Sequence, residues 1–294
     1  MTSLLAIANA SAGTANDDAV DTALGTLRSG ADVEVARTSG PHDLDAALAA
    51  HPDVDVVVAM GGDGSLHAVI DALHRADRLG SVVVGLVPLG TGNDFARTVG
   101  VPADDPAGAA RIVLDGRTIE VDLATTADGE VVVNAVHAGV GAEAAAAGKP
   151  WKERFGPFGY VIGALTAGFK VPGERLSVRV DGEEIAQGRH VIQAGAGIGR
   201  YVGGGTPLLP DADVSDGLLD VAVSFAAPWY RRLVYAWHLR SGRHGFLEDV
   251  TSTRGHEVVV RGATWRATND GELGEPVPEH RWTIQPAAWR LRVP

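Results

Sequence analysis

The chain contains no cysteine among its 294 residues. This absence excludes disulfide bonds, thiolate metal ligands and a cysteine nucleophile. Basic residues are also fewer than acidic ones. The chain has 25 Lys and Arg residues and 37 Asp and Glu residues, so its formal net charge is −12. General nucleic-acid binding needs a cationic surface, so we expect no nucleic-acid partner. The same acidity argues against adsorption to anionic lipid through the whole surface, although a local basic patch stays open.

Long apolar runs are missing as well. No stretch approaches the roughly 20 apolar residues that cross a bilayer. The first apolar run, residues 4–8, is too short for the core of a signal peptide and is predicted to be a strand. With 45% hydrophobic and 21% charged residues, the composition is typical of a folded globular protein. We therefore expect a cytoplasmic protein that contacts a membrane only transiently, at its periphery.

Short apolar runs and helical patterns alternate in the first third of the chain. Runs rich in Val, Ile and Leu, without polar alternation, are typical of parallel strands that are covered on both faces. Such runs lie at residues 4–8, 33–36, 54–60 and 82–88. Helical patterns lie at residues 15–28 and 44–50, and after Ser65, where Leu66, Val69, Ile70 and Leu73 share one face. This alternation predicts a doubly wound α/β sheet.

The pattern changes near Val121, where strand candidates separated by turn residues begin. These candidates are residues 130–136, 176–180, 190–194, 218–225, 257–260 and 282–285. Asp128-Gly129 and Asp181-Gly182 are typical of hairpin turns, and helical insertions are predicted around residues 158–169 and 228–240. We therefore predict an α/β domain over residues 1–121 and a mainly antiparallel β domain over residues 122–294. Whether the last strand packs back on the first domain is left open.

A glycine-rich turn follows the third apolar run. Residues 54–60 lead directly into Gly61-Gly62-Asp63-Gly64-Ser65, and a helical pattern begins after this turn. Glycines let backbone N–H groups approach an anion, and a helix N-terminus adds unpaired N–H groups. The turn therefore predicts a phosphate site at the carboxyl end of a strand, and the alternative is a simple connection capped by Ser65. Neither a Walker A loop nor a dinucleotide fingerprint is present.

A second polar loop follows the next apolar run. The chain there reads Pro88-Leu89-Gly90-Thr91-Gly92-Asn93-Asp94-Phe95-Ala96-Arg97. This loop offers a hydroxyl, glycines, an amide, a carboxylate and a guanidinium at the end of a neighbouring strand. Such groups suit a triphosphate and its magnesium ion. Together the two loops predict nucleotide binding.

Both loops resemble the diacylglycerol kinase catalytic-domain family, especially its soluble bacterial lipid kinases. Asn9-Ala10-Ser11-Ala12-Gly13 is similar to the family's nucleotide loop, with alanine in place of proline, and Thr38 stands where relatives have a nucleotide-contacting threonine. Residues 134–143 resemble an Asn-x-x-Gly-x-Gly-x-Asp segment in which Glu143 replaces the aspartate. Further motifs match in the same order, at Gly203-Gly204-Gly205, at Asp216-Gly217-Leu218-Leu219-Asp220 and at Asn269-Asp270-Gly271-Glu272.

This resemblance implies an ATP- and Mg²⁺-dependent kinase that phosphorylates diacylglycerol or a related lipid alcohol. It also implies a nucleotide-binding α/β domain joined to a β-sandwich, with the active site in the interdomain cleft. The implied ATP contacts are Asn9, Ala10, Ser11, Ala12, Gly13, Thr38, Gly61, Gly62, Asp63, Gly64, Ser65, Leu66, His67, Thr91 and Asn93. Asp63 and Asp94 would act near the phosphates and their magnesium ion.

Two further site assignments come only from the resemblance. Glu272 corresponds to the base that takes the proton from the lipid hydroxyl. Asp213, Asp216 and Leu218, the last through its carbonyl, correspond to ligands of a second, structural magnesium ion. Taken by themselves, Glu272 is more typical of a solvated turn and Asp216-Gly217 of a hairpin.

Other functions stay open at this point. NAD kinases also use a Gly-Gly-Asp-Gly turn on a related fold, although residues 88–97 and 216–220 favour the lipid branch. An inactive nucleotide-binding regulator is a further alternative, against which the intact Asp63, Asp94 and Glu272 argue. The acceptor is not identified among diacylglycerol, phosphatidylglycerol, ceramide and a long-chain base, and a homodimer is left open.

One segment has the composition of a helix at a membrane interface. Residues 228–240 include two tryptophans, two tyrosines and three arginines, and Pro228 and Ser241-Gly242 suit the two ends of a helix. The alternative is a helix packed on the β domain with its arginines pointing outward. The neighbouring residues 155–169 are a second candidate for membrane contact.

Overall fold

The computed structural model describes residues 2–9, 14–139, 173–186, 189–225 and 228–294. The chain forms two compact units, one containing Met1–Leu123 and Pro286–Pro294 and the other containing Ala124–Gln285. The helical insertion predicted at residues 158–169 and the membrane-contact candidate at residues 155–169 lie outside the described residues, as do Glu143 and residues 10–13 of the predicted nucleotide loop.

Parallel strands form the sheet of the first unit, in the order β2-β1-β3-β4. They are β1 (Ser3–Asn9), β2 (Asp32–Thr38), β3 (Val56–Gly61) and β4 (Val83–Pro88). The end of β17 (Val277–Val293) continues this sheet, because Arg290 and Leu291 pair in parallel with Val83 and Val84. β5 (Arg117–Thr126) in turn pairs with β17. The predicted parallel strands are confirmed, with small shifts at their ends. The expected burial on both faces is wrong for β2, because β2 lies at the edge of the sheet and none of its residues is buried.

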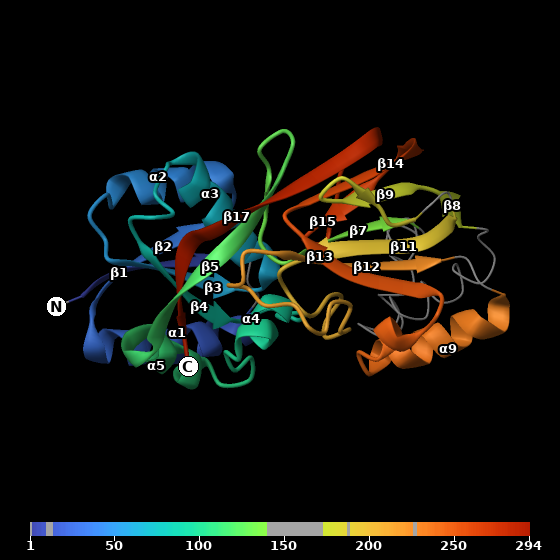
Figure 1. Cartoon of the computed structure of the whole chain (residues 1–294). Coiled ribbons are helices and arrows are strands. Elements are labelled where there is room, and N and C mark those ends of the chain that lie inside the picture. Colours follow the sequence, from blue (N-terminus) through green and yellow to red (C-terminus); the bar gives the residue numbers. More distant parts are fainter. Residues whose placement is uncertain (1, 10–13, 140–172, 187–188, 226–227) are drawn as a thin grey trace. The chain divides into compact units, whose positions relative to one another are not determined.

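Helices cover both faces of this sheet, α1 and α5 on one face and α2 and α3 on the other (Figure 1). The helices of this unit are α1 (Thr14–Gly30), α2 (Pro41–Ala50), α3 (Asp63–Arg75), α4 (Asp94–Val99) and α5 (Pro106–Asp115). The predicted apolar face of α3 is buried. α5 approaches the sheet closely, since a Cβ atom on Gly85 would lie 2.8 Å from Val113. The doubly wound α/β architecture is therefore confirmed.

Trp289 fixes the end of β17 to the first unit. Its side chain is buried, and its indole N–H donates to the carbonyl oxygen of Asp122 at 3.0 Å. The indole also lies 5.8 Å from the ring of Phe95, which belongs to the first turn of α4. The carboxylate of Asp122 accepts the N–H of Ala287 at 2.8 Å. The chain terminus thus supports the helix that follows the second polar loop.

The second unit contains two antiparallel arrays of strands. One has the order β10-β9-β14-β17 and the other the order β13-β12-β11-β7-β15-β16, with β8 beside β11 and β6 beside β5. The strands are β6 (Val131–Val132), β7 (Ala135–Gly139), β8 (Glu174–Arg175), β9 (Ser177–Val180), β10 (Glu183–Glu184), β11 (His190–Gly197), β12 (Leu219–Phe225), β13 (Val250–Gly255), β14 (Glu257–Trp265), β15 (Ala267–Asn269) and β16 (Glu272–Leu273). This arrangement is sandwich-like, as predicted.

Two helical segments complete the described part of the second unit. They are α9 (Trp229–Arg240), which confirms the helix predicted at residues 228–240, and the 3₁₀ helix η1 (His244–Phe246). Among the described helices of the whole chain, none has the length and apolar character needed to span a bilayer.

Burial lowers the pKa of three histidines of the second unit, His137, His244 and His280, so we expect this unit to be sensitive to acid. The pKa of His137 falls to about 4. The Nε2 atom of His244 lies 2.9 Å from the carbonyl oxygen of Leu208, and its buried Nδ1 has no hydrogen-bond partner among the described residues. The three imidazoles are therefore neutral in the fold, whereas in the unfolded chain they bind protons near pH 6.5. Stability is fully present above that pH and is lost as the pH falls toward 4.

We expect the free energy of unfolding to fall when the pH is lowered from 7.5 to 5. The lowering of the pKa of His137 from 6.5 to about 4 corresponds in full to a contribution on the order of 3 kcal/mol. His244→Gln should make the fall smaller, because glutamine can donate to Leu208 and has no group to protonate in this range. Urea unfolding at both pH values checks this, with the exposed His42→Gln as the control. Equal falls in wild type and His244→Gln would contradict it.

Candidate active site

The residues predicted to contact a nucleotide lie at one edge of the parallel sheet. Strand register places Asn9 of β1 opposite Thr38 of β2, and Gly61 of β3 opposite Pro88 of β4. Because these strands are parallel and adjacent, their carboxyl ends meet at the same edge. The structure therefore brings together Thr38, the turn that begins at Gly61 and the loop that follows Pro88.

The two glycine loops contact each other through their backbones. A Cβ atom on Gly90 would lie 2.5 Å from Cα of Gly62, and the N–H of Leu89 donates to the carbonyl oxygen of Gly61 at 2.9 Å. A Cβ atom on Gly61 would collide with the hydroxyl of Ser65. Only glycine permits so close an approach. We refer to this contact between Gly61-Gly62 and Gly90 as the loop junction.

Asp63 connects the first turn of α3 to the first turn of α4. Its Oδ2 accepts the N–H of Asp94 at 3.0 Å, and its Oδ1 accepts the N–H of Phe95 at 3.0 Å. Such amides at a helix start have no carbonyl partner within the helix, and a carboxylate suits the positive end of the helix dipole. Asp63 thus caps a helix that begins 31 residues further along the chain. Sequence analysis did not find this role.

Asn93 determines the shape of the second loop. Its backbone is in the left-handed region, with φ 52° and ψ 41°, which asparagine tolerates better than most residues. Its Oδ1 accepts the N–H of Gly90 at 3.1 Å, and its Nδ2 donates to the carbonyl oxygen of Gly90 at 2.7 Å. The buried side chain of Asn93 therefore holds Gly90 in place at the loop junction.

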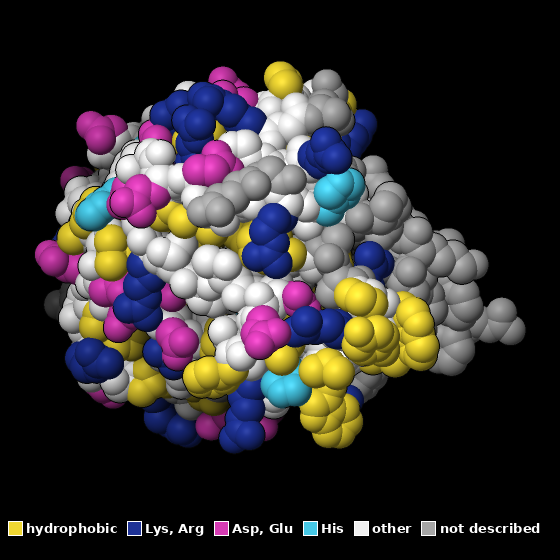
Figure 2. All heavy atoms as spheres, turned by 45° about the vertical axis from the view of Figure 1, so that its right-hand side comes forward, with side chains coloured by type: hydrophobic (Ala, Val, Ile, Leu, Met, Phe, Trp, Pro, Cys, Tyr) yellow, Lys and Arg dark blue, Asp and Glu magenta, His cyan; other side chains and the backbone are white. Residues whose placement is uncertain are grey.

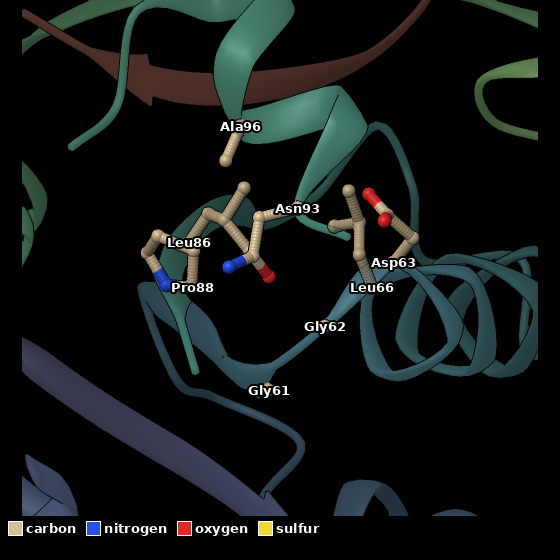
Figure 3. A pocket seen from close by; sticks show the side chains of 8 residues that line it. All are labelled: Gly61, Gly62, Asp63, Leu66, Leu86, Pro88, Asn93 and Ala96. Atoms are coloured by element: carbon tan, nitrogen blue, oxygen red, sulfur yellow. The ribbon is translucent and has the colours of Figure 1, made fainter. Parts of the chain in front are cut away.

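A small pocket lies at the loop junction (Figure 3). Its lining residues are Gly61, Gly62, Asp63, Leu66, Leu86, Pro88, Asn93 and Ala96. The pocket encloses no space that would admit even a water molecule, so it is far smaller than ordinary small-molecule sites. It therefore marks the contact between the two loops and is too small for a whole nucleotide.

In the second unit, a tight hairpin turn places Glu272. Asn269 pairs with Glu272 across β15 and β16, and the two residues between them, Asp270 and Gly271, have φ values of 48° and 91°. Two consecutive positive φ values are typical of a type I′ turn, for which Asp-Gly is a preferred sequence. Glu272 itself is exposed, immediately after the turn.

Asp270 fastens this turn to the chain before β7. Its carboxylate accepts three backbone N–H groups, from Val133 at 2.7 Å, Asn134 at 2.9 Å and Ala135 at 3.0 Å. The N–H of Asp270 donates in return to the carbonyl oxygen of Ala135 at 3.0 Å. Charge-assisted bonds of this kind are stronger than neutral ones, so they fix the position of the turn and of Glu272. The sequence gives no sign of them, because the partner amides lie at least 135 residues earlier.

The predicted ligands of the second magnesium ion lie on the loop before β12. One oxygen of Asp213 accepts both the N–H and the hydroxyl of Ser215, and one oxygen of Asp216 accepts the N–H of Leu218 at 3.1 Å. Two carboxylates and a carbonyl are oxygen donors of the kind that magnesium binds. Across the described ranges, however, no group of three or more acidic or histidine side chains is placed to hold a metal ion.

Arg254 provides a positive charge beside these carboxylates. Its Nη1 lies 3.6 Å from Oδ2 of Asp216, and its Nε lies 3.1 Å from Oδ1 of Asp220. Burial raises the pKa of Asp220, and the guanidinium opposes this rise. Arg254 also donates to the carbonyl oxygen of Asp211 at 2.9 Å. The loop is therefore tied to β13 by an arginine that sequence analysis did not identify.

Family comparisons cover both units. Residues 3–126 match the diacylglycerol kinase catalytic domain. Residues 134–293 match the YegS C-terminal NAD kinase beta sandwich-like domain. The first match includes the loop junction, and the second includes the turn that holds Glu272.

Individual relatives agree with these matches. A "Probable lipid kinase YegS-like" protein of Stenotrophomonas maltophilia (strain K279a) is 31% identical over 288 residues, which are 95% of this chain and 92% of the relative. A diacylglycerol kinase of Mycobacterium tuberculosis (strain ATCC 25618 / H37Rv) is 30% identical over 256 residues, covering 85% of this chain and 80% of that protein. The crystal structure of a diacylglycerol kinase from Bacillus anthracis str. Sterne has a TM-score of 0.79 at 20% identity, covers 100% of this chain and 97% of its own, and supports the fold. The chain therefore belongs to the diacylglycerol kinase catalytic-domain family, as a lipid kinase of the type whose C-terminal unit is a YegS-type β-sandwich.

Proposed function

We propose that this protein transfers the γ-phosphate of ATP to the hydroxyl of diacylglycerol or a related lipid alcohol, in a Mg²⁺-dependent reaction that gives phosphatidic acid or its equivalent. The loop junction is the observation that best supports this proposal. It holds two glycine-rich loops at the ends of adjacent parallel strands, and Asp63 bonds one to the other. The names of the relatives support a lipid as the acceptor.

In this proposal the phosphates of ATP lie against the first turn of α3. Asp63 and Gly64 begin this helix, so their N–H groups have no carbonyl partner within it and can donate to phosphate oxygens. Asn9, Thr38 and Thr91 extend the binding surface along the same edge of the sheet. The loop junction keeps these donors in place before the nucleotide arrives, which lowers the entropy lost on binding.

Glu272 is the proposed proton acceptor. The lipid oxygen forms a bond to the γ-phosphorus, the bond from that phosphorus to the β,γ-bridging oxygen breaks, and ADP leaves with the electron pair. The hydroxyl proton passes to the carboxylate of Glu272. Magnesium, when bound, neutralises charge on the phosphate oxygens. Asp63 and Asp94 are the proposed acids near the nucleotide. The proposed ligands of a second, structural magnesium ion are Asp213, Asp216 and the carbonyl of Leu218.

Phosphotransfer from labelled ATP to a lipid panel tests the proposal. The panel contains diacylglycerol, phosphatidylglycerol, ceramide and a long-chain base in mixed micelles, together with NAD. We expect label in a lipid and none in NAD, loss of transfer with a chelator, and recovery with added Mg²⁺. Label in NAD alone would instead favour the dinucleotide kinase, and binding of ATP without any transfer would favour a regulator.

A further inference from the structure

Helix α9 presents its apolar side chains to solvent. Trp229 and Trp237 are 64% and 75% exposed, and Tyr230, Leu233 and Val234 are exposed as well. At about 100° per residue, these five side chains fall within one arc of about 140° around the helix. A surface helix of a globular protein normally turns its apolar face inward. The orientation of α9 is the reverse, and none of its residues is buried.

The opposite side of α9 holds the helix on the second unit. Arg231 bonds to Glu248 at 3.0 Å and to Asp249 at 2.7 Å. The hydroxyl of Tyr235 lies 3.1 Å from Oε1 of Gln193, and Leu239 packs against an apolar cluster that includes Leu208. These contacts fix which face of α9 points outward. The arginines divide between the two sides, since Arg231 bonds to residues of the second unit whereas Arg240 is exposed.

Positive charge lies beside the exposed apolar face. Residues 228–246 include four arginines and no Asp or Glu, although the whole chain has a net charge of −12. One of the four, Arg231, is paired with Glu248 and Asp249. Arg240 and Arg243 are exposed at the end of the helix, and Phe246 of η1, next to them in sequence, is 88% exposed. Figure 2 shows a cluster of apolar side chains with basic side chains beside it at the lower right of the face drawn.

We propose that the exposed face of α9, together with Arg240, Arg243 and Phe246, is a docking surface for a bilayer that contains anionic lipid. Tryptophan and tyrosine beside arginine are typical of side chains at the boundary between headgroups and acyl chains. A second copy that met this face with its own would bring the same arginines against each other, and like charges repel, which disfavours a second copy as the occupant. The biological role of this docking surface rests on the proposed function, because the lipid alcohol that the protein is proposed to phosphorylate lies in a membrane.

Vesicle cosedimentation tests this surface without substrate or ATP. We expect binding to vesicles of phosphatidylglycerol and phosphatidylcholine, and much weaker binding to phosphatidylcholine alone. Trp229→Ala with Trp237→Ala should weaken binding by about tenfold or more, because two interfacial side chains are lost. Unchanged binding of this double variant would overturn the proposal.

Arginine variants provide a matched pair. Arg240 and Arg28 are both exposed residues in the last turn of an α-helix, in α9 and α1 respectively. Replacing either by glutamate changes the net charge equally. Arg240→Glu should weaken binding to anionic vesicles by about fivefold or more, while Arg28→Glu should leave it near wild type. Equal effects would show that overall charge alone governs the binding and would overturn the proposal.

Tryptophan fluorescence distinguishes a bilayer from other occupants. Of the tryptophans that the structure describes, Trp265, Trp282 and Trp289 are buried, and those of α9 are exposed. Brominated lipid should therefore quench emission in wild type more than in the double variant. The double variant should also keep the wild-type melting temperature and sedimentation coefficient. A lower melting temperature of the double variant would show that this face packs against the chain itself. A lower oligomeric state would show that it packs against a second copy. Either result would overturn the proposal.

The two proposals fail in different ways. A water-soluble short-chain diacylglycerol needs no membrane docking, so the double variant should phosphorylate it at the wild-type rate and should lose activity only on diacylglycerol held in vesicles. If no lipid is phosphorylated while vesicle binding still depends on Trp229 and Trp237, the kinase proposal fails and the docking surface stands. If both substrates lose activity equally, the docking proposal fails.

Discussion

Glu272→Gln is expected to lower turnover with a lipid acceptor by about 10²- to 10⁴-fold, the usual contribution of a general base. Glutamine has nearly the same size as glutamate but cannot accept a proton at neutral pH. Affinity for ATP should change little, because the nucleotide contacts are proposed for the first unit. Stability should also be unchanged, since Glu272 is exposed. The measurements are the rate of phosphotransfer in mixed micelles and the Kd of a non-hydrolysable ATP analogue.

The chain contains its own control for this substitution. Asp181-Gly182-Glu183 repeats the Asp-Gly-Glu sequence in another two-residue hairpin, with φ values of 49° and 85° at Asp181 and Gly182. Asp181 likewise accepts backbone N–H groups, from His256 and Glu257. Glu183 is exposed, so Glu183→Gln makes the same chemical change in the same local structure. We expect wild-type turnover from it. Loss of ATP affinity together with turnover in Glu272→Gln would contradict the assignment and indicate a structural role.

This repetition shows what local sequence can and cannot predict. Asp-Gly predicts both type I′ turns because only a few residues tolerate consecutive positive φ values. The same three letters do not say which glutamate serves catalysis, because that depends on neighbours far away in the chain. For Glu272 the position is set by Asp270 and the amides of residues 133–135. The family resemblance identifies Glu272 as the proposed base, whereas the local sequence does not distinguish it from Glu183.

Strands and helices were predictable where burial sets a clear period. The strands β1, β3 and β4 are apolar on both faces, and the buried side of α3 repeats at helical spacing, so these elements are visible in the sequence. β2 differs, because it is an edge strand whose polar and apolar residues alternate, and none of them is buried. The strand predicted at residues 130–136 is divided into β6 and β7, and the amides of Val133 and Asn134 between them bond to Asp270. α5 was missed because its buried face includes Ala109 and Ala110, which give a weak apolar signal.

The loop junction was predictable in part. The glycines of both loops indicated close backbone approach, but the sequence did not indicate that the approach is to each other. Asp63 was assigned to phosphates and magnesium, and the structure adds a bond from each of its oxygens to α4. Phe95 and Trp289 support the same helix from the far end of the chain. Contacts over such separations follow from tertiary structure and leave no local pattern.

Gly90→Ala is expected to weaken ATP binding by at least about tenfold, and it tests the loop junction most directly. The added methyl group would lie 2.5 Å from Cα of Gly62 and 3.0 Å from Oδ1 of Asn93, so backbone atoms must move. A strain of this kind costs about 1–3 kcal/mol, and any movement displaces the N–H groups proposed to hold phosphate. The measurements are the free energy of unfolding in urea and the Kd of an ATP analogue at a temperature where the variant is folded.

Gly25→Ala is the matched control for Gly90→Ala. Gly25 lies within α1, and a Cβ atom there would meet nothing within 4 Å. Alanine in a helix interior should raise stability by about 0.5–1 kcal/mol and leave ATP binding unchanged. If Gly90→Ala bound ATP as wild type does, the nucleotide would not depend on the loop junction. The phosphate site would then have to be assigned to other strand ends, beginning with those of β1 and β2, where Asn9 and Thr38 pair.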